Sequence, residues 1–176
     1  ATYRQSSAGS EKLVRLDQSN RLLARGSRFR LPAEMIRDNA LAISGRLQEQ
    51  IGGPPVKPYQ PEGLWLEMSY GNSGGKAYKQ DHGQHPYRRG LYTFWKRSIL
   101  YPSFSAFDAP IREECTVSRS VTNTPLQAFV TLNDMAFVEA ARVFGERIMR
   151  EGGGSSADGI EFAMELALSR PPSSSE

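Results

Sequence analysis

The sequence predicts a mainly α-helical fold with an irregular set of helices, long Pro-, Gly- and aromatic-rich loops, and little or no β-structure. Apolar residues recur at helical spacing in residues 32–51 and again after Thr124. Clusters of Gly and Pro separate these stretches, and strands do not alternate with helices as a parallel sheet requires. We expect one helical domain over residues 1–176, as part of a larger protein.

Bulk composition limits the classes of protein to which the chain can belong. Hydrophobic residues make up 39% and charged residues 23% of the sequence, as in ordinary globular domains. The net charge is +3 and the basic residues are dispersed, so we expect no nucleic-acid partner. No apolar run approaches the roughly 18 residues of a membrane helix, and we expect no membrane span.

Cysteine usage bears on disulfides, haem and thiol chemistry. Cys115 is the only cysteine, which excludes an internal disulfide and a Cys-x-x-Cys-His haem attachment within these residues. The neighbouring Glu113 and Glu114 place negative charge beside its thiol, which disfavours a reactive thiolate. We therefore expect Cys115 to be a small buried hydrophobe, and we expect no cofactor within this segment.

The N-terminal part of the chain predicts helices of different lengths. Residues 10–26 favour one or two short helices interrupted near residues 17–20. A longer helix is predicted over residues 32–51, with Pro32 at its first position and Gly and Pro pairs beyond its end. Its predicted inward stripe consists of Ile36, Ala40, Ile43, Leu47 and Ile51.

The middle of the chain is harder to assign. Periodicity disappears in residues 54–85, which we predict to be a long loop, either functional, packed on the surface by its aromatic rings, or partly disordered. Residues 86–100 favour a helix because apolar residues recur every four positions, although a strand around Leu91 to Trp95 is also compatible with the pattern. Cys115, Val117 and Val121 could form a short extended piece.

The C-terminal third carries clear helix-capping signals. Thr124 and Gln127 form a capping box that should begin a helix, and Asn133-Asp134 should break it in two. Glycines 152–154 should end the second helix, and Ser155 or Ser156 should cap a last one. The predicted inward stripe of the first two helices consists of Leu126, Val130, Phe137, Ala141, Phe144 and Ile148.

Candidate ligand-binding residues come mainly from the long loop and the segment after it. Aromatic rings beside polar loops can stack on sugars or on partner proteins, although packing of these rings between the loop and the helical core is the simpler interpretation. This aromatic set consists of Tyr59, Trp65, Tyr70, Tyr87, Tyr92, Phe94 and Trp95. The ligand-binding candidates are Trp65, Tyr70, Asp81, His82, Arg88, Arg89 and Asp108.

Metal binding and catalysis receive weaker support from the sequence. Asp81, His82 and His85 could begin a metal site, but a zinc site needs three or four ligands in fixed geometry and no further histidine exists. Ordinary loop histidines are the simpler interpretation, and we expect no metal. Paired acids such as Asp81 and Asp108 could act in sugar hydrolysis only at a separation that sequence does not give. The sequence leaves open whether the protein is an enzyme.

Several strings together resemble a known family. They are ATYRQSS at 1–7, NRLLARGSRFRLPAEMIRDNALAISG at 20–45, YRRGLYTFWKRS at 87–98, FDAPIREECTVSRSVTNTPLQAFVTLND at 107–134, and LALSRPP at 166–172. They are similar to the planctomycete-specific C-terminal domain of unknown function found in large exported bacterial proteins, often linked to cytochrome c-like domains. The resemblance implies a periplasmic or cell-surface location and a multidomain parent, and it supplies no catalytic residues.

Two functional hypotheses follow from these observations. The first is a non-catalytic accessory or interaction module whose partners are the upstream domains of the same polypeptide. The alternative is an extracellular polysaccharide-binding or polysaccharide-processing domain, with a glycan as its partner. The second hypothesis requires Trp65, Asp81, His82 and Asp108 to meet in one concave pocket. The first requires a broad apolar patch to remain uncovered.

Overall fold

The chain forms two compact units, Ala1–Leu31 and Pro32–Glu176. The structure is a computed structural model that describes residues 5–67 and 78–173. Its architecture is mainly helical, and the described residues form isolated β-bridges but no sheet, which confirms the predicted fold class. The single domain predicted for residues 1–176 stays a prediction.

The first unit contains the short helix α1, Glu11–Leu16. The Ser10 hydroxyl caps it by accepting a hydrogen bond from the Leu13 backbone N–H at 3.3 Å. Beyond α1, the predicted interruption near residues 17–20 is present, but no second helix follows it. Asn20 and Leu23 both adopt a left-handed φ of 52°, so this part of the chain consists of turns.

The second unit begins with α2, Ala33–Ser44, which is shorter than the helix predicted over residues 32–51. Gly45 ends it with a left-handed φ of 77°, a conformation that glycine adopts without steric cost. The residues that follow are not helical, and Ile51 is 91% exposed, so the predicted end of this helix and the end of its stripe were wrong. The buried face of α2 consists of Ala33, Arg37, Leu41 and Ser44.

The long segment after α2 packs through backbone hydrogen bonds to residues 87–94. Val56 donates to the Tyr92 carbonyl and accepts from the Phe94 N–H, both at 2.7 Å, and Gln48 donates to the Tyr87 carbonyl at 3.0 Å. Within this segment, α3 spans Leu64–Glu67.

The helix predicted over residues 86–100 is not present. Two 3₁₀ turns, η2 (His85–Tyr87) and η3 (Gly90–Tyr92), take its place and are followed by non-helical chain. The backbone groups of this segment bond across to Val56 and Gln48 rather than along a helix. The four-residue spacing therefore did not reflect a buried helical face, and Leu91 is 69% exposed.

Aromatic side chains dominate the core of the second unit. Helix α4, Pro102–Ala106, contributes Phe104, which meets Tyr101 edge to face with ring centroids 5.2 Å apart. The buried cluster consists of Ala33, Tyr101, Phe104, Phe107 and Ala109. Ile36, Trp95, Leu100, Val130 and Phe137 pack against this cluster.

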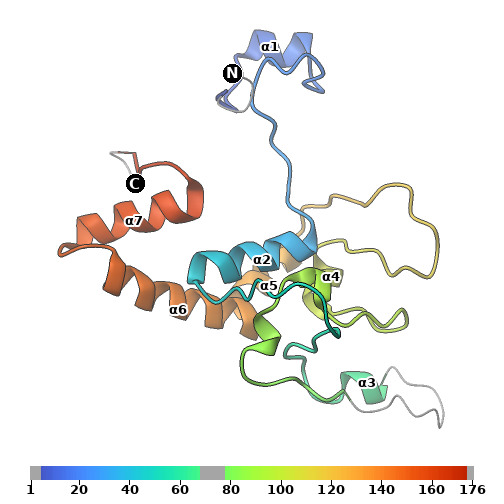
Figure 1. Ribbon diagram of the computed structural model, residues 1–176. Coiled ribbons are helices and arrows are strands. Elements are labelled where there is room, and N and C mark those ends of the chain that lie inside the picture. Colours follow the sequence, from blue (N-terminus) through green and yellow to red (C-terminus); the bar gives the residue numbers. More distant parts are fainter. Residues whose placement is uncertain (1–4, 68–77, 174–176) are drawn as a thin grey trace. The chain divides into compact units, whose positions relative to one another are not determined.

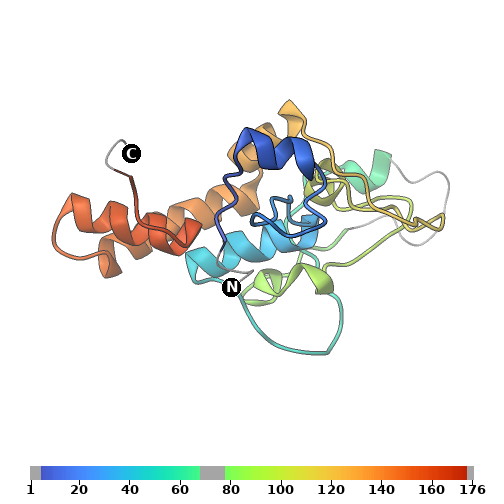
Figure 2. The ribbon, with the colours of Figure 1, turned by 90° about the horizontal axis from the view of Figure 1, so that it is seen from above.

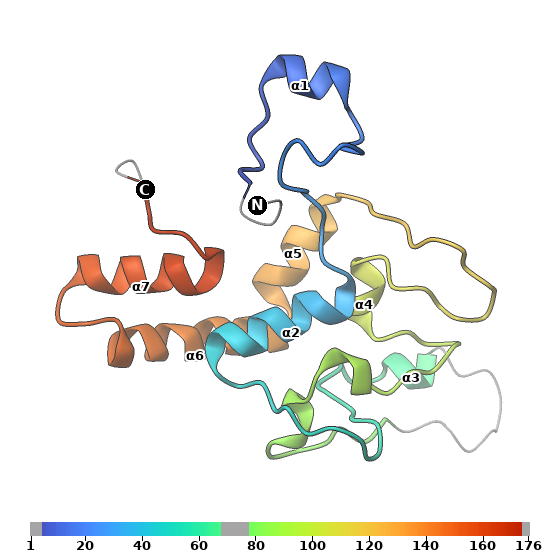
Figure 3. The same ribbon diagram turned by 45° about the horizontal axis from the view of Figure 1, so that its top comes forward.

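Residues 111–126 are all exposed, and they contain neither a buried cysteine nor a strand. Cys115 is exposed, so its predicted burial was wrong. Polar and cation–π contacts, and not a buried apolar stripe, attach this segment to the rest of the unit. The Arg112 guanidinium lies 3.8 Å from the Trp95 ring centroid, and Arg119 forms two hydrogen bonds with Glu34 at 2.7 and 3.0 Å. Figure 3 shows residues 111–124 looping away from α4 before the next helix begins at Pro125.

Three helices complete the unit, with boundaries close to those predicted from capping residues. Helix α5, Pro125–Asn133, begins at the Thr124 capping box, and Asp134 caps α6, Met135–Glu151. Gly152 ends α6, and Ser155 caps α7, Ser156–Leu168. The predicted stripe was wrong at Leu126 and Ala141, which are exposed.

Helix α6 is the central helix of the second unit, because three other helices pack against it. It packs against α2, α5 and α7, and both Figure 1 and Figure 2 show α2 lying alongside it and α7 turning back beside it. Among the described residues, none of the helices combines the length and the apolar character needed to cross a membrane.

Candidate functional site

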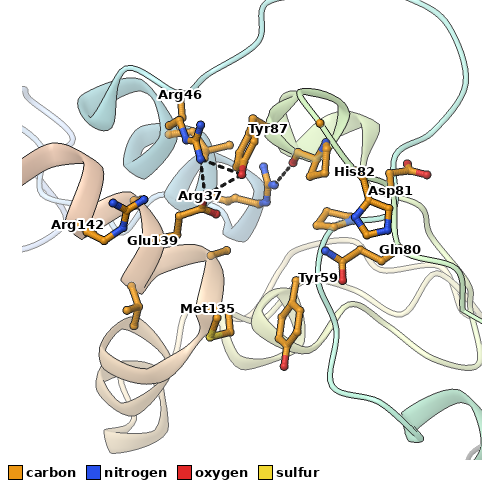
Figure 4. A pocket seen from close by; sticks show the side chains of 17 residues that line it. Arg37, Arg46, Tyr59, Gln80, Asp81, His82, Tyr87, Met135, Glu139 and Arg142 are labelled. Carbon is orange, nitrogen blue, oxygen red and sulfur yellow. Dashed lines mark hydrogen bonds and ion pairs between the residues drawn. The ribbon is translucent and has the colours of Figure 1, made fainter. Parts of the chain in front are cut away.

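A cleft of about 480 Å³ lies between α2, the first half of α6, and the loop segments 58–59, 80–83 and 86–87. Figure 4 shows Glu139, Arg46 and Tyr87 on one side of it and Gln80 and His82 on the other. Its apolar lining comes from Leu41, Pro58, Pro86, Met135, Ala136, Val138 and Ala140.

The polar centre of the cleft is a network of Glu139, Arg46 and Tyr87. The Tyr87 hydroxyl donates to Glu139 Oε1 at 2.7 Å, and Arg46 forms an ion pair with the same oxygen. Arg46 also donates to the Tyr87 hydroxyl oxygen at 3.0 Å, and its guanidinium lies 4.2 Å from the Tyr87 ring centroid. The network joins α6 to the chain just after α2 and to η2, across the end of the cleft.

These contacts shift the pKa values of the two acidic groups in opposite directions. Burial alone would raise the pKa of Glu139, but the hydrogen bonds from Tyr87 and Arg46 and the charge of Arg46 lower it overall. Burial and the nearby Glu139 carboxylate raise the pKa of Tyr87. At neutral pH the network therefore holds an ionised carboxylate and a neutral phenol.

The lowered pKa of Glu139 predicts a loss of stability in acid. Because the folded-state pKa lies below the ordinary value of 4.5, the stabilisation is present above that value and is lost as the pH falls through the folded-state pKa. We expect the free energy of unfolding, measured in urea from about pH 5 to about pH 3, to fall less steeply in Glu139→Gln than in the wild type. Glu161→Gln, at an exposed position on α7, serves as control and should keep the wild-type slope. Equal slopes for the wild type and Glu139→Gln would contradict the prediction.

One wall of the cleft is positioned by the buried Arg37 of α2. Its side chain donates to the carbonyl of Arg88 at 3.0 Å and also to the carbonyl of Pro86. Since Arg37 is only 4% exposed, these bonds hold η2 against α2 from the protein interior.

Arg88, one of the predicted ligand-binding residues, is 2% exposed and points away from solvent. It donates to the carbonyls of Pro54 at 2.9 Å and Gln50 at 3.1 Å, and also to that of Gly52. Its guanidinium lies 4.0 Å from the Tyr92 ring centroid. Arg88 therefore stabilises the conformation of residues 50–54 and is not available to bind a ligand from solvent.

The neighbouring Arg89 is exposed and forms an ion pair with Asp38 of α2 at 3.3 Å. The other oxygen of Asp38 accepts a hydrogen bond from the Gly90 backbone N–H. Arg89 therefore contributes to the contact between η3 and α2.

Asp81 and His82, which were predicted to bind a ligand, line the cleft. Asp81 accepts a hydrogen bond from the Lys57 backbone N–H at 2.8 Å, so its carboxylate ties residues 57 and 81 together. His82 is exposed.

Trp65 and Asp108 do not line this cleft. Trp65 is 8% exposed and donates from its indole N–H to Gln60 Oε1 at 2.9 Å. Its ring contacts Tyr78 and Phe94 at centroid distances of 5.2 and 5.8 Å, so it seals the loop onto the core. Asp108 accepts hydrogen bonds from the backbone and the hydroxyl of Thr122 at 2.8 and 2.9 Å. Tyr70 lies outside the described residues.

Of the residues that the polysaccharide hypothesis requires to meet in one pocket, only Asp81 and His82 line the cleft among those described.

Arg46 and Glu139 were not predicted as site residues, because two residues that are 93 positions apart leave no local sequence pattern. Tyr59 and Tyr87 belonged to the aromatic set, but nothing in the sequence distinguished them from Trp65. In the part of the chain that the structure describes, no three His, Cys, Asp or Glu side chains are grouped so as to hold a metal ion.

The comparisons with known proteins agree with the resemblance at the level of the family. No curated protein and no solved structure matches the chain. A family model described as PSD1, a protein of unknown function (DUF1553), matches residues 1–176. Because this match covers the whole sequence, the chain belongs to the PSD1 family of proteins of unknown function (DUF1553).

Proposed function

We propose that the chain is a non-catalytic interaction module of an exported multidomain protein. The observation that carries this proposal is an apolar surface on α5 and the start of α6, which we name the α5 face. It consists of Leu126, Phe129, Leu132, Met135 and Val138, whose exposed fractions are 59, 63, 72, 54 and 44%.

Three of these residues share one side of α5. Leu126, Phe129 and Leu132 follow one another at three-residue steps along α5, which places neighbouring members on adjoining parts of one side of the helix. Contiguous apolar surfaces of this kind mark contacts with other proteins, because their exposure to water is unfavourable.

The charge state of the cleft supports a binding role over a catalytic one. A carboxylic acid that acts as a general acid near neutral pH needs a raised pKa. The pKa of Glu139 is lowered, and its carboxylate is engaged by Tyr87 and Arg46. Glu139 is therefore suited to hold a hydrogen-bonded geometry.

The partner that we propose for the α5 face is an upstream domain of the same polypeptide, in a periplasmic or cell-surface setting. The resemblance of the sequence to domains of exported multidomain proteins supports this choice. A cytochrome c-like domain is the kind of neighbour that the resemblance implies.

Methionine oxidation tests this proposal. Met135 lies in the α5 face and Met149, which is 87% exposed, lies near the other end of α6. We expect hydrogen peroxide to oxidise both in the 176-residue chain, whereas in a longer polypeptide with the upstream domains Met135 should react more slowly and Met149 should serve as the unchanged control.

A second variant makes the oxidation test specific for the α5 face. Phe129→Ser should restore the oxidation rate of Met135 in the longer polypeptide, because it weakens the apolar contact without touching Met135 itself. Equal Met135 oxidation rates in the short and the longer wild-type polypeptide would refute the proposed partner.

A further inference from the structure

We propose that the cleft between α2 and α6 binds a neutral sugar residue of a glycan, stacked on Tyr59 and hydrogen-bonded by Glu139 and Arg46. Met135 and Val138 of the α5 face also line the cleft, but the residues that carry the proposal, Tyr59, Glu139 and Arg46, lie outside that face. Of the polysaccharide site expected from the sequence, the cleft contains Asp81 and His82 but neither Trp65 nor Asp108. Its basis is the charge balance, the hydrogen-bonding groups and the exposed ring of the cleft.

The charges around the cleft are balanced within the protein. Three guanidinium groups line it, those of Arg37, Arg46 and Arg142. Each of these groups has a partner within the protein: Arg46 pairs with Glu139, Arg142 pairs with Glu146, and the buried Arg37 donates to two backbone carbonyls. The Asp81 carboxylate accepts a hydrogen bond from the Lys57 backbone N–H. A charged ligand would have no uncompensated opposite charge to meet, so the balance favours a neutral ligand.

The polar groups of the cleft supply both donors and acceptors. The hydrogen bonds from Tyr87 and Arg46 both end on Glu139 Oε1, which leaves Oε2 able to accept from a ligand hydroxyl. Figure 4 shows the Glu139 carboxylate directed toward the interior of the cleft. The Gln80 amide, on the opposite wall, offers one donor and one acceptor group. Sugar hydroxyls donate and accept at once, which matches this mixed set.

The remaining surface suits the apolar face of a sugar ring. Tyr59 is 39% exposed and Met135 is 54% exposed, and both side chains line the cleft (Figure 4). Aromatic rings pack against apolar surface while their polar tips remain in water. A volume of about 480 Å³ lies within the range of small-molecule sites.

Binding of neutral disaccharides to the 176-residue chain tests the proposal. The probes are cellobiose, mannobiose and chitobiose at millimolar concentrations, with glucuronate and lysine as charged comparators. We expect saturable changes in the NMR signals of the Met135 methyl group and the Tyr59 ring with at least one neutral probe. Tyr59→Ala should weaken binding about tenfold, the size of effect that a central aromatic contact commonly has.

Two further variants separate a local effect from a general one. Glu139→Gln should also weaken binding, since it removes the charged acceptor, and Val121→Ala, at an exposed apolar position outside the cleft, should leave binding unchanged. If Glu139→Gln disturbs folding, Tyr59→Ala still decides, because its side chain is substantially exposed. The absence of saturable binding by the neutral probes, tighter binding of glucuronate or lysine, or wild-type affinity in Tyr59→Ala would each overturn the proposal.

Discussion

Replacement of Arg88 by methionine is expected to lower the free energy of unfolding by about 3 kcal/mol. The 2% exposed guanidinium donates to the carbonyls of Gln50, Gly52 and Pro54, and methionine cannot donate to any of them. The carbonyls belong to exposed residues that water can reach, so we expect a net loss of roughly 1 kcal/mol for each of the three hydrogen bonds. Urea unfolding followed by circular dichroism measures the difference.

A matched arginine variant provides the control for the Arg88 experiment. Arg97 is exposed and lies in the same segment, so Arg97→Met should change the free energy of unfolding by less than about 0.5 kcal/mol. Arg88→Lys should remain well below wild-type stability, because an ammonium group cannot reproduce the planar fork of the guanidinium. If Arg88→Met were as stable as Arg97→Met, the carbonyl contacts would not hold this part of the fold.

Alanine at Gly90 is expected to destabilise the protein by about 2–3 kcal/mol. A Cβ added there would lie 2.7 Å from the backbone oxygen and 2.9 Å from the Cα of Glu34 on α2. Both are backbone atoms, so relief of the clash requires η3 and α2 to separate, which would also disturb the hydrogen bond from the Gly90 N–H to Asp38. Thermal or urea unfolding of the variant gives the measurement.

Alanine at a second glycine of the same unit, Gly145, should raise the free energy of unfolding instead of lowering it. Gly145 lies inside α6, and a Cβ built on it would meet nothing within 4 Å. Gly145→Ala should therefore stabilise the protein by about 0.5–1 kcal/mol, because alanine loses less backbone entropy in a helix. If Gly90→Ala and Gly145→Ala changed the free energy of unfolding equally, the close approach of η3 to α2 would not be the reason that residue 90 is glycine.

The sequence predicted the helix boundaries best where a side chain bonds to the backbone a few residues away. Thr124, Asp134 and Ser155 all cap helices as expected, since capping depends on local chemistry. The predicted end of α2 was wrong because the left-handed turn at Gly45 overrode the apolar spacing beyond it. The helix expected over residues 86–100 was wrong because that segment finds its backbone partners in distant chain.

The candidate site was only partly predictable for the same physical reason. Asp81 and His82 were selected as neighbours in sequence, and they do line the cleft. Glu139 and Arg46 meet only because α6 packs beside α2 and the chain turns at Gly45. Trp65 was predicted to bind a ligand because large aromatic rings can stack on sugars, but a ring of that size stabilises the fold most when it is buried, and here it is buried.

The arginines Arg37 and Arg88 reach carbonyl oxygens of the main chain, a group that every amino acid carries. A clamp of this kind fixes the path of a loop without specifying its side chains. The wall of the cleft at residues 86–88 could therefore be relined by substitution of Tyr87 while its backbone stayed in place.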